Sequence, residues 1–128
     1  MNRLIDSVRT IFQPRAARQR KLAASRPPLT RDEFVAATVA RGGDAEAAGF
    51  IWSHLEAWGL ESGFSPHPDD DLDSSYGIAE EERDEDLVGN LLASLSVPLP
   101  TSDRLREFEP VDTLLDVARL AHQLRAMR

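Results

Sequence analysis

The sequence predicts an all-α protein, a small helical bundle preceded by an extra basic helix at the N-terminus. Three observations lead to this prediction. Apolar residues recur at helical spacing in several stretches, glycine and proline separate these stretches, and no stretch alternates apolar and polar residues as a half-buried strand does. The chain has 128 residues, of which 41% are hydrophobic, so it is long enough for one domain with a buried core.

The first segment, residues 1–28, is predicted to be a basic amphipathic arm ahead of a helical domain at 29–128. Its apolar residues follow helical spacing up to Pro14, which ends the pattern. These residues are Leu4, Ile5, Val8, Ile11 and Phe12. Pro27 and Pro28 then separate the arm from the domain, because consecutive prolines form a rigid break.

Charge divides the chain at nearly the same place. Residues 1–31 carry eight basic residues against Asp6 alone, whereas residues 32–128 carry seven basic residues and 21 acids. Four contacts are open for the arm: the core of its own chain, a protein partner or second copy, a membrane surface, or nucleic acid reached through residues 1–21. The arm also has the composition of a transit peptide. A further expectation is that it pairs with the acidic part of the same chain.

The globular part is expected to begin with a helix from about 31 to 40. Thr30 and Glu33 have the spacing of a capping box, in which the two side chains bond to each other's backbone amide. Gly42 and Gly43 follow the last apolar residue of the stretch and are predicted to end the helix, because glycine adopts the left-handed conformation that commonly follows a helix.

A second helix is predicted over 45–58, between an N-cap at Asp44 and a stop at Gly59. Its apolar residues share one face, as they do in a helix that packs on a core. Trp52 and Trp58 are expected to lie in the core or at its rim. A role in stacking on a ligand has no other support in the sequence.

The second half begins with a long loop at 60–78 and continues with three predicted elements. These are an amphipathic helix from about 80 to 95, a short turn at 101–108 and a final helix at 111–126. The first turns of the 80–95 helix are strongly acidic, with Glu80, Glu81, Glu82, Asp84, Glu85 and Asp86. Negative charge is stabilising at the N-terminal end of a helix, but six acids exceed what capping requires.

Together these features resemble the acyl carrier protein family over about residues 72–120. An acidic loop leads to Tyr-Gly-Ile at 76–78, and the acidic helix carries Asp-Leu-Val-x-x-Leu-Leu at 86–92. Val-Pro-Leu-Pro follows at 97–100, and Phe-Glu-Pro-Val-Asp-Thr-Leu-Leu-Asp-Val at 108–117 is similar to the last carrier helix. The resemblance implies the carrier fold, here with an additional N-terminal helix.

The residue that bears the carrier prosthetic group is missing at its expected position. Carriers attach phosphopantetheine to a serine at the start of their second helix, which corresponds to 80–82, where this chain has only glutamate. The resemblance therefore implies a degenerate member without a cofactor, of the kind found among small bacterial proteins. The alternative is a working carrier with a displaced attachment site at Ser74 or Ser75, which follow Asp73.

In carriers the acidic second helix docks on basic patches of partner enzymes. The resemblance thus predicts a non-enzymatic interaction module for a basic protein partner, and neither a catalytic residue nor a small-molecule substrate is expected. The expected contact residues are Asp70, Asp71, Asp73, Glu81, Glu82, Asp84, Glu85 and Asp86. The chain contains no cysteine and no apolar run long enough for a bilayer span, so a cytoplasmic protein is expected.

Two metal-binding motifs are matched only in part. His67-Pro68-Asp69-Asp70 is similar to a signature of zinc-dependent N-deacetylases, but no strand precedes it. The acids at 69, 71, 73 and 80 have the spacing of a calcium loop, in which Ser74 stands where the sharp turn needs glycine. No metal site is therefore predicted.

Overall fold

The computed structural model describes residues 14–78, 83–108 and 110–127, and these residues form helices and loops without a β-strand. The all-α prediction is confirmed for this part of the chain. In the first half the helices are α2 (Pro14–Ser25), α3 (Arg31–Ala40) and α4 (Ala45–Trp58). In the second half they are α5 (Leu72–Tyr76), the π-helical segment η1 (Arg83–Val88), α7 (Gly89–Ser94), α8 (Ser102–Arg106) and α9 (Leu114–Ala126).

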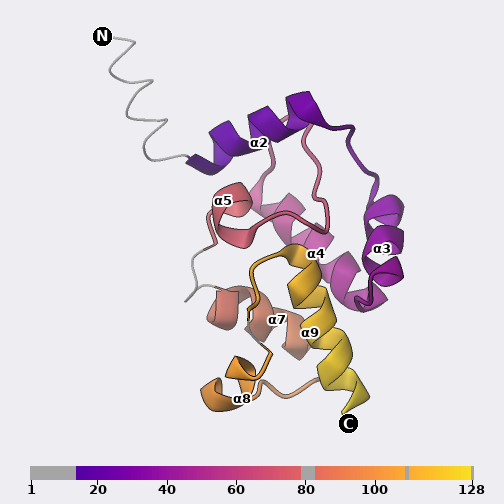
Figure 1. Cartoon of the computed structure of the whole chain (residues 1–128), viewed down its shortest axis with the longest axis vertical. Coiled ribbons are helices and arrows are strands. Elements are labelled where there is room, and N and C mark those ends of the chain that lie inside the picture. Colours follow the sequence, from indigo (N-terminus) through magenta and orange to yellow (C-terminus); the bar gives the residue numbers. More distant parts are fainter. Residues whose placement is uncertain (1–13, 79–82, 109, 128) are drawn as a thin grey trace.

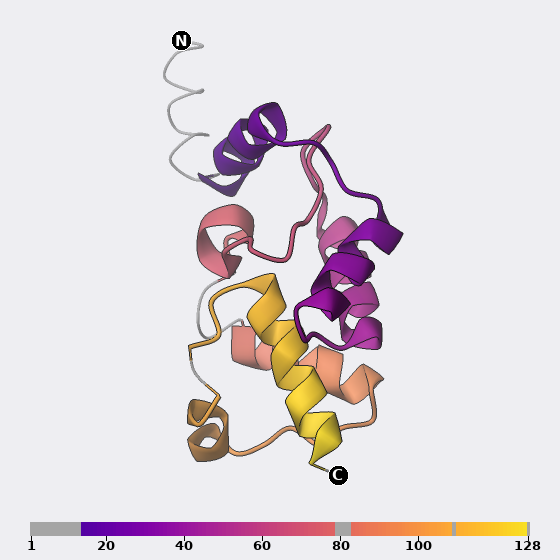
Figure 2. The same ribbon diagram turned by 45° about the vertical axis from the view of Figure 1, so that its right-hand side comes forward.

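The helices stack along one long axis. Figure 1 shows α2 at one end of the molecule, with α8 and the C-terminal end of α9 at the other. The same arrangement is visible after the rotation in Figure 2, in which α4 lies between the two ends and α9 runs from the middle of the molecule to the end that holds the C-terminus. None of the helices in the described ranges has the length and hydropathy needed to cross a bilayer.

The hairpin of α3 and α4 has the predicted caps. Thr30 and Glu33 form the capping box, with bonds of 3.0 and 3.2 Å between their side chains and backbone amides. At the turn, a Cβ built on Gly43 would lie 2.5 Å from Cγ2 of Thr38 and 2.9 Å from Cβ of Ala118. Only glycine fits there, because real Cβ atoms do not approach other atoms so closely. The turn is thereby held against α9.

The core lies between α4, α9 and the η1–α7 segment. The largest side chains with less than 2% exposure are Tyr76, Phe34, Ile51, Leu55, Ile78, Leu87, Leu91, Leu92, Leu114, Val88 and Val117. Trp52 is half-buried with its ring centroid 5.6 Å from that of Phe34, whereas Trp58 is 38% exposed. The two tryptophans thus lie at the rim of the core.

The expected loop at 60–78 contains a helix that the sequence analysis missed. The carboxylate of Asp71 caps the first turn of α5, and Gly77 ends the helix with a left-handed φ of 68°. Five residues are too few to show a helical repeat of apolar positions, so α5 was undetectable by periodicity.

The helix predicted over 80–95 continues without a break from η1 into α7 and ends at Ser94, and residues 79–82 lie outside the described ranges. One expected boundary was wrong. The helix predicted to start at residue 111 begins at Leu114, because Thr113 and Asp116 form a capping box. Val111 is buried in the preceding loop, and its apolar side chain extended the helical pattern beyond the helix itself.

The described part of the basic arm packs on the rest of the chain. Helix α2 contacts α5, and Leu22 and Ala23 pack against the core. Residues 1–13, which include the five apolar positions of the arm, lie outside the described ranges. Helix α2 is therefore packed against α5 and the core in the described part of the chain.

Candidate protein-interaction surface

Two acidic segments that are far apart in the sequence meet at the start of α9. Asp71 and Thr113 form an isolated antiparallel bridge. The amide of Leu72 donates to the carbonyl of Asp112 at 2.8 Å, and the amide of Leu114 donates to the carbonyl of Asp70 at 3.1 Å. These backbone bonds bring the acidic loop beside the N-terminal end of the last helix.

Two carboxylates at this junction cap helices. Oδ1 of Asp71 accepts hydrogen bonds from the amides of Asp73 and Ser74, at 3.0 and 2.8 Å. Oδ2 of Asp116 accepts bonds from the amides of Asp112 and Thr113, at 3.0 and 3.1 Å. These hydrogen bonds to backbone amides at helix N-termini fix the positions of both side chains.

Four carboxylates around the bridge form what we call the acidic face. Its members are Asp71, Asp73, Asp112 and Asp116. Asp73 and Asp112 are exposed, and Asp71 and Asp116 are half-buried. No ion pair joins any of the four to a basic side chain within the described ranges. The acidic face therefore presents unneutralised negative charge from two separate segments.

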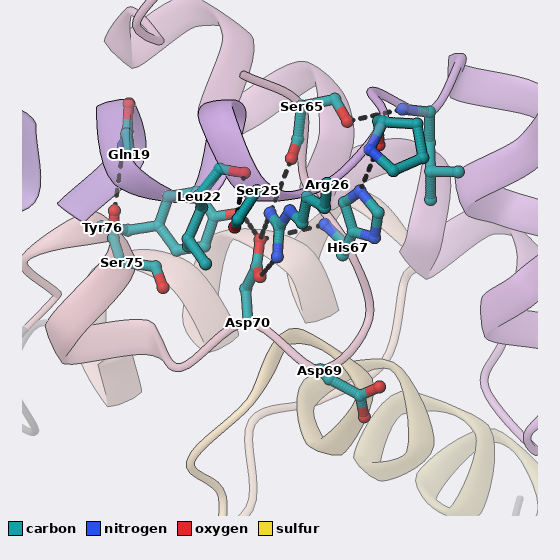
Figure 3. Close-up of polar contacts among 12 residues, drawn as sticks. Gln19, Leu22, Ser25, Arg26, Ser65, His67, Asp69, Asp70, Ser75 and Tyr76 are labelled. Atoms are coloured by element: carbon teal, nitrogen blue, oxygen red, sulfur yellow. Dashed lines mark hydrogen bonds and ion pairs between the residues drawn. The ribbon is translucent and has the colours of Figure 1, made fainter. Parts of the chain in front are cut away.

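Asp70 differs from its neighbour because it is buried and paired. It is 4% exposed, and its two carboxylate oxygens accept from the guanidinium of Arg26 at 2.5 and 2.9 Å. The hydroxyl of Tyr76 and the backbone amide of His67 also donate to it, at 2.5 and 3.0 Å. Figure 3 shows these groups converging on Asp70 from α2, α5 and the loop.

The same guanidinium makes two further contacts that fix its position. It donates to the carbonyl of Ser65 at 3.0 Å, and it lies 5.2 Å from the ring centroid of Phe64. Burial, together with the charge of Asp70, raises the pKa of Tyr76 far above its ordinary value. Asp70 thus fastens α2 to the loop, and in this conformation it is not available to a partner.

Polar contacts at the middle of α2 add to this attachment. Nε2 of Gln19 donates to the carbonyl of Ser75 at 2.9 Å, and Oε1 of Gln19 accepts from the amide of Glu61 at 3.0 Å. Arg20 forms an ion pair with the side chain of Glu61 at 2.7 Å. The basic arm and the acidic loop are therefore paired within one molecule, through Arg20 and Arg26.

The other expected contact residues are distributed unevenly. Asp86 is exposed on η1, whereas Asp69, which was not among the expected contact residues, forms an ion pair with Arg41 at 2.6 Å. The backbone of Asp84 and Glu85 forms part of η1, and the structure does not describe their side chains. Glu81 and Glu82 lie wholly outside the described ranges.

The two candidate attachment serines have opposite environments. Ser74 is exposed on the short helix α5, whereas Ser75 is 2% exposed and lies beneath Gln19 of α2. A phosphopantetheinyl transferase needs an accessible hydroxyl, so Ser75 cannot be modified unless α2 moves. Ser74 is the accessible one of the pair.

Neither metal motif assembles a ligand set in the described part of the chain, which holds no cluster of three or more potential metal ligands. The motif residues make other contacts instead. Nε2 of His67 lies 3.2 Å from the carbonyl of Pro27, Asp70 is paired with Arg26, and Asp71 bonds to backbone amides. Each of these three side chains therefore has a partner within the described part of the chain.

Sequence reasoning missed half of the acidic face. Asp112 and Asp116 were assigned to a helix remote from the loop, and only the Asp71–Thr113 bridge brings them beside it. The spacing of Thr113 and Asp116, which is that of a capping box, was the available signal for their place at a helix start.

Comparison with protein families, with curated proteins and with solved structures gave no match to this chain.

Proposed function

We propose that this chain is a non-enzymatic helical module that binds a basic segment of a protein partner through the acidic face. One observation carries the proposal. The chain has 15 basic residues, and it pairs two of them with Asp69 and Asp70. The adjacent carboxylates of the acidic face receive no such partner in the described ranges, although they lie close to one another.

Clustered negative charge has a cost and a use. Like charges repel, so an unneutralised cluster lowers the stability of the folded state. The same charge attracts a positively charged surface and accelerates its association, particularly at low ionic strength. The sequence adds the acids at 80–86, so that residues 61–90 hold 11 acids against Arg83 alone.

We further propose that the fold is that of a carrier protein without its prosthetic group. The order of elements supports this proposal, because an acidic loop, the η1–α7 segment and the final helix α9 follow one another as in the resemblance, whereas the short helix α5 is an addition that the resemblance does not predict. Glutamate occupies 80–82, where a carrier has its modified serine. A carrier that cannot be loaded retains only the capacity to dock on other proteins.

The test uses a short Arg- and Lys-rich peptide as the basic probe and its glutamine-substituted analogue as the neutral one. We expect the full chain to bind the basic peptide with an affinity that falls steeply with added salt. The variant Asp73→Lys with Asp112→Lys should abolish binding, because both side chains are exposed members of the acidic face. Amide chemical shifts on binding should change around the bridge at Asp71.

A matched variant on α8 distinguishes a defined surface from net charge. Asp103→Lys with Glu107→Lys changes the charge of the chain equally, at exposed positions in and directly after α8, outside the acidic face. It should bind the basic peptide like the unaltered chain. Equal weakening in both variants, or binding that salt does not affect, would contradict the proposal.

A further inference from the structure

Helix α2 has two faces of different character. Gln19, Leu22 and Arg26 face the rest of the chain, where they contact α5, the core and the acidic loop. The opposite face is exposed and carries two cations among small side chains. We call it the cationic face, and its members are Arg18, Lys21, Ala24 and Ser25.

The charge of the cationic face is not neutralised within the described ranges. Arg18 and Lys21 form no ion pair or hydrogen bond with another described residue. The sequence has no acidic residue between Asp6 and Asp32 that could pair with them from a neighbouring position. The described part of the chain thus has two unneutralised surfaces of opposite sign, the cationic face and the acidic face.

These two surfaces are neighbours on the molecule. Helix α2 packs on α5, which carries Asp73 of the acidic face. Nε2 of Gln19 donates to the carbonyl of Ser75 in α5 at 2.9 Å. A Cβ built on Gly77, directly after α5, would lie 3.7 Å from Cδ of Arg15. Figures 1 and 2 both show α5 beside α2, so positive and negative charge lie on adjoining helices.

Adjoining surfaces of opposite charge are complementary to themselves. In a symmetric dimer both copies use the same surface, so each patch of one copy contacts a different patch of the other. A two-fold axis between the cationic face and the acidic face sets each of them against its opposite in a second copy. One contact then neutralises both surfaces, whereas a nucleic acid or an anionic lipid would neutralise the cations alone.

We propose that two copies of this chain associate, with the cationic face of each against the acidic face of the other. This inference rests on the proposed function, because it uses the acidic face as a binding surface and names a second copy as a basic partner. The net charge of −7 repels the two copies at long range. The association therefore depends on the local arrangement of charge on the two faces.

Sedimentation velocity of the full chain over a range of concentrations tests the proposal, and we expect a concentration-dependent dimer. Arg18→Glu with Lys21→Glu reverses the charge of the cationic face. Asp73→Lys with Asp112→Lys reverses the exposed charge of the acidic face. Either variant sets like charges against each other, so its self-association should weaken by more than about tenfold. All four side chains are exposed, and thermal unfolding should show that both variants are folded.

Mixing the two variants gives the sharpest comparison. In a mixed dimer each face again meets the opposite charge, so the equimolar mixture should dimerise at concentrations at which each variant alone is monomeric. The lysine variant also moves the net charge of −7 four units toward zero. Its loss of self-association therefore cannot arise from repulsion between the net charges of two copies.

The matched control is Arg104→Glu with Arg106→Glu, which changes the net charge as much as Arg18→Glu with Lys21→Glu does. Both side chains are exposed on α8, at the opposite end of the molecule from α2 (Figure 1). This control should dimerise like the unaltered chain.

Four outcomes would overturn the proposal. They are an unaltered chain that is monomeric at every concentration, a dimer that both charge-reversed variants retain, equal weakening in the α8 control, and a mixture of the two variants that stays monomeric. Phosphatidylserine vesicles and a duplex oligonucleotide are tested on the same samples. If a monomeric chain binds either of them and loses this binding in Arg18→Glu with Lys21→Glu, the cationic face belongs to that anion instead.

The basic peptide separates this proposal from the proposed function. It should bind the Arg18→Glu with Lys21→Glu variant, whose acidic face is unaltered, and it should dissociate the dimer of the unaltered chain by competing for that face. A monomeric chain that binds the peptide would reject the dimer and retain the proposed function. A dimer that follows the charge-reversal pattern but does not bind the peptide would retain the dimer and reject the binding of basic segments in general.

Discussion

The guanidinium of Arg26 donates to both carboxylate oxygens of Asp70, a residue 44 positions later in the sequence. The side chain of Asp70 is 3% exposed, so the pair is largely removed from water. Removing one member of a buried pair leaves the other charge unpaired, which typically costs about 3–5 kcal/mol. We expect Arg26→Met, which keeps most of the aliphatic stem, to lower the free energy of unfolding in urea by this amount.

An exposed pair in the same molecule serves as the control. Arg41 and Asp69 approach to 2.6 Å, but their side chains are 47% and 73% exposed. Exposed ion pairs contribute about 0–1 kcal/mol, so Arg41→Met should have a small effect. Equal losses in Arg26→Met and Arg41→Met would mean that burial is not what makes the Arg26–Asp70 pair important.

The ionisation of Tyr76 should be coupled to unfolding. Burial and then Asp70 raise its pKa above the ordinary value of 10.0. The folded state thus favours the neutral phenol, so the stability that it contributes is complete below pH 10 and is lost as pH rises above that value. The chain has one tyrosine, so tyrosinate absorbance reports on it alone. We expect that absorbance to appear together with the loss of helical circular dichroism.

The variant Tyr76→Phe gives the control for this titration. It removes the hydroxyl that donates to the Asp70 carboxylate and should cost about 1.5–3 kcal/mol at neutral pH, as expected for a hydrogen bond to a charged group. Its stability should then depend less on pH above 10 than that of the unaltered chain. Tyrosinate that forms in the fully folded protein would contradict the assignment.

His54 should make the protein less stable in mild acid. Its ring lies between Phe50 and Trp58, with centroids 5.7 and 5.1 Å away, and its buried Nε2 has no hydrogen-bond partner. Burial lowers the pKa of His54 below 6.5, although Asp86 opposes the shift. The unfolded state therefore binds the proton more readily, and stability is present above pH 6.5 and falls as pH drops below it.

The measurement is the melting temperature between neutral pH and pH 5. We expect His54→Phe, which keeps an aromatic ring beside Phe50, to flatten the decline. His122→Gln is the comparison, because His122 is exposed on α9 and its replacement should leave the decline in place. An unchanged profile in His54→Phe would show that another group governs the acid sensitivity.

Gly43→Ala should destabilise the protein by overpacking. The added methyl would lie 2.5 Å from Cγ2 of Thr38 and 2.9 Å from Cβ of Ala118. Forcing an extra carbon into a packed site typically costs about 1–3 kcal/mol. In a double-mutant cycle measured by urea unfolding, Thr38→Ser should recover part of this loss, because serine lacks Cγ2. Additive losses would indicate that the turn relaxes away from Thr38 on its own.

Co-expression with a broad-specificity phosphopantetheinyl transferase should leave the intact mass of the chain unchanged. Glutamate replaces serine at 80–82, the hydroxyl of Ser75 is buried, and the exposed Ser74 lies well before the position at which carriers are modified. Intact-protein mass spectrometry measures the outcome directly. An adduct that is absent from Ser74→Ala and present in Ser75→Ala would show instead that the chain is a working carrier with a displaced attachment site.

The sequence predicted local structure where one short pattern determines it. Thr30 and Glu33 identified the start of α3 because both halves of a capping box lie within four residues. The equivalent box at Thr113 and Asp116 was overlooked, since the buried Val111 continued the apolar spacing upstream of it. Apolar spacing reports burial, and a buried loop residue gives the same signal as a helical one.

Contacts between segments far apart in the chain could not be predicted from the sequence. Arg26 and Asp70 both lie in polar stretches that read as exposed, and their burial depends on how α2 crosses the loop. Of the four members of the acidic face, only Asp71 and Asp73 were expected contact residues. Asp112 lies beside them because of the bridge between Asp71 and Thr113, which the sequence does not reveal. The charge of the two segments led us to expect pairing between the basic arm and the acidic loop. The sequence did not indicate that Arg20 pairs with Glu61 and Arg26 with Asp70.

The two anchoring points of the loop are neighbours in the chain. Asp70 is bound to α2 through Arg26, and Asp71, the next residue, is paired with Thr113 at the start of α9. A single peptide bond therefore joins the residue that holds α2 to the residue that holds the start of α9. Because the two attachments are adjacent, one short stretch of backbone positions α2 and the start of α9 relative to each other.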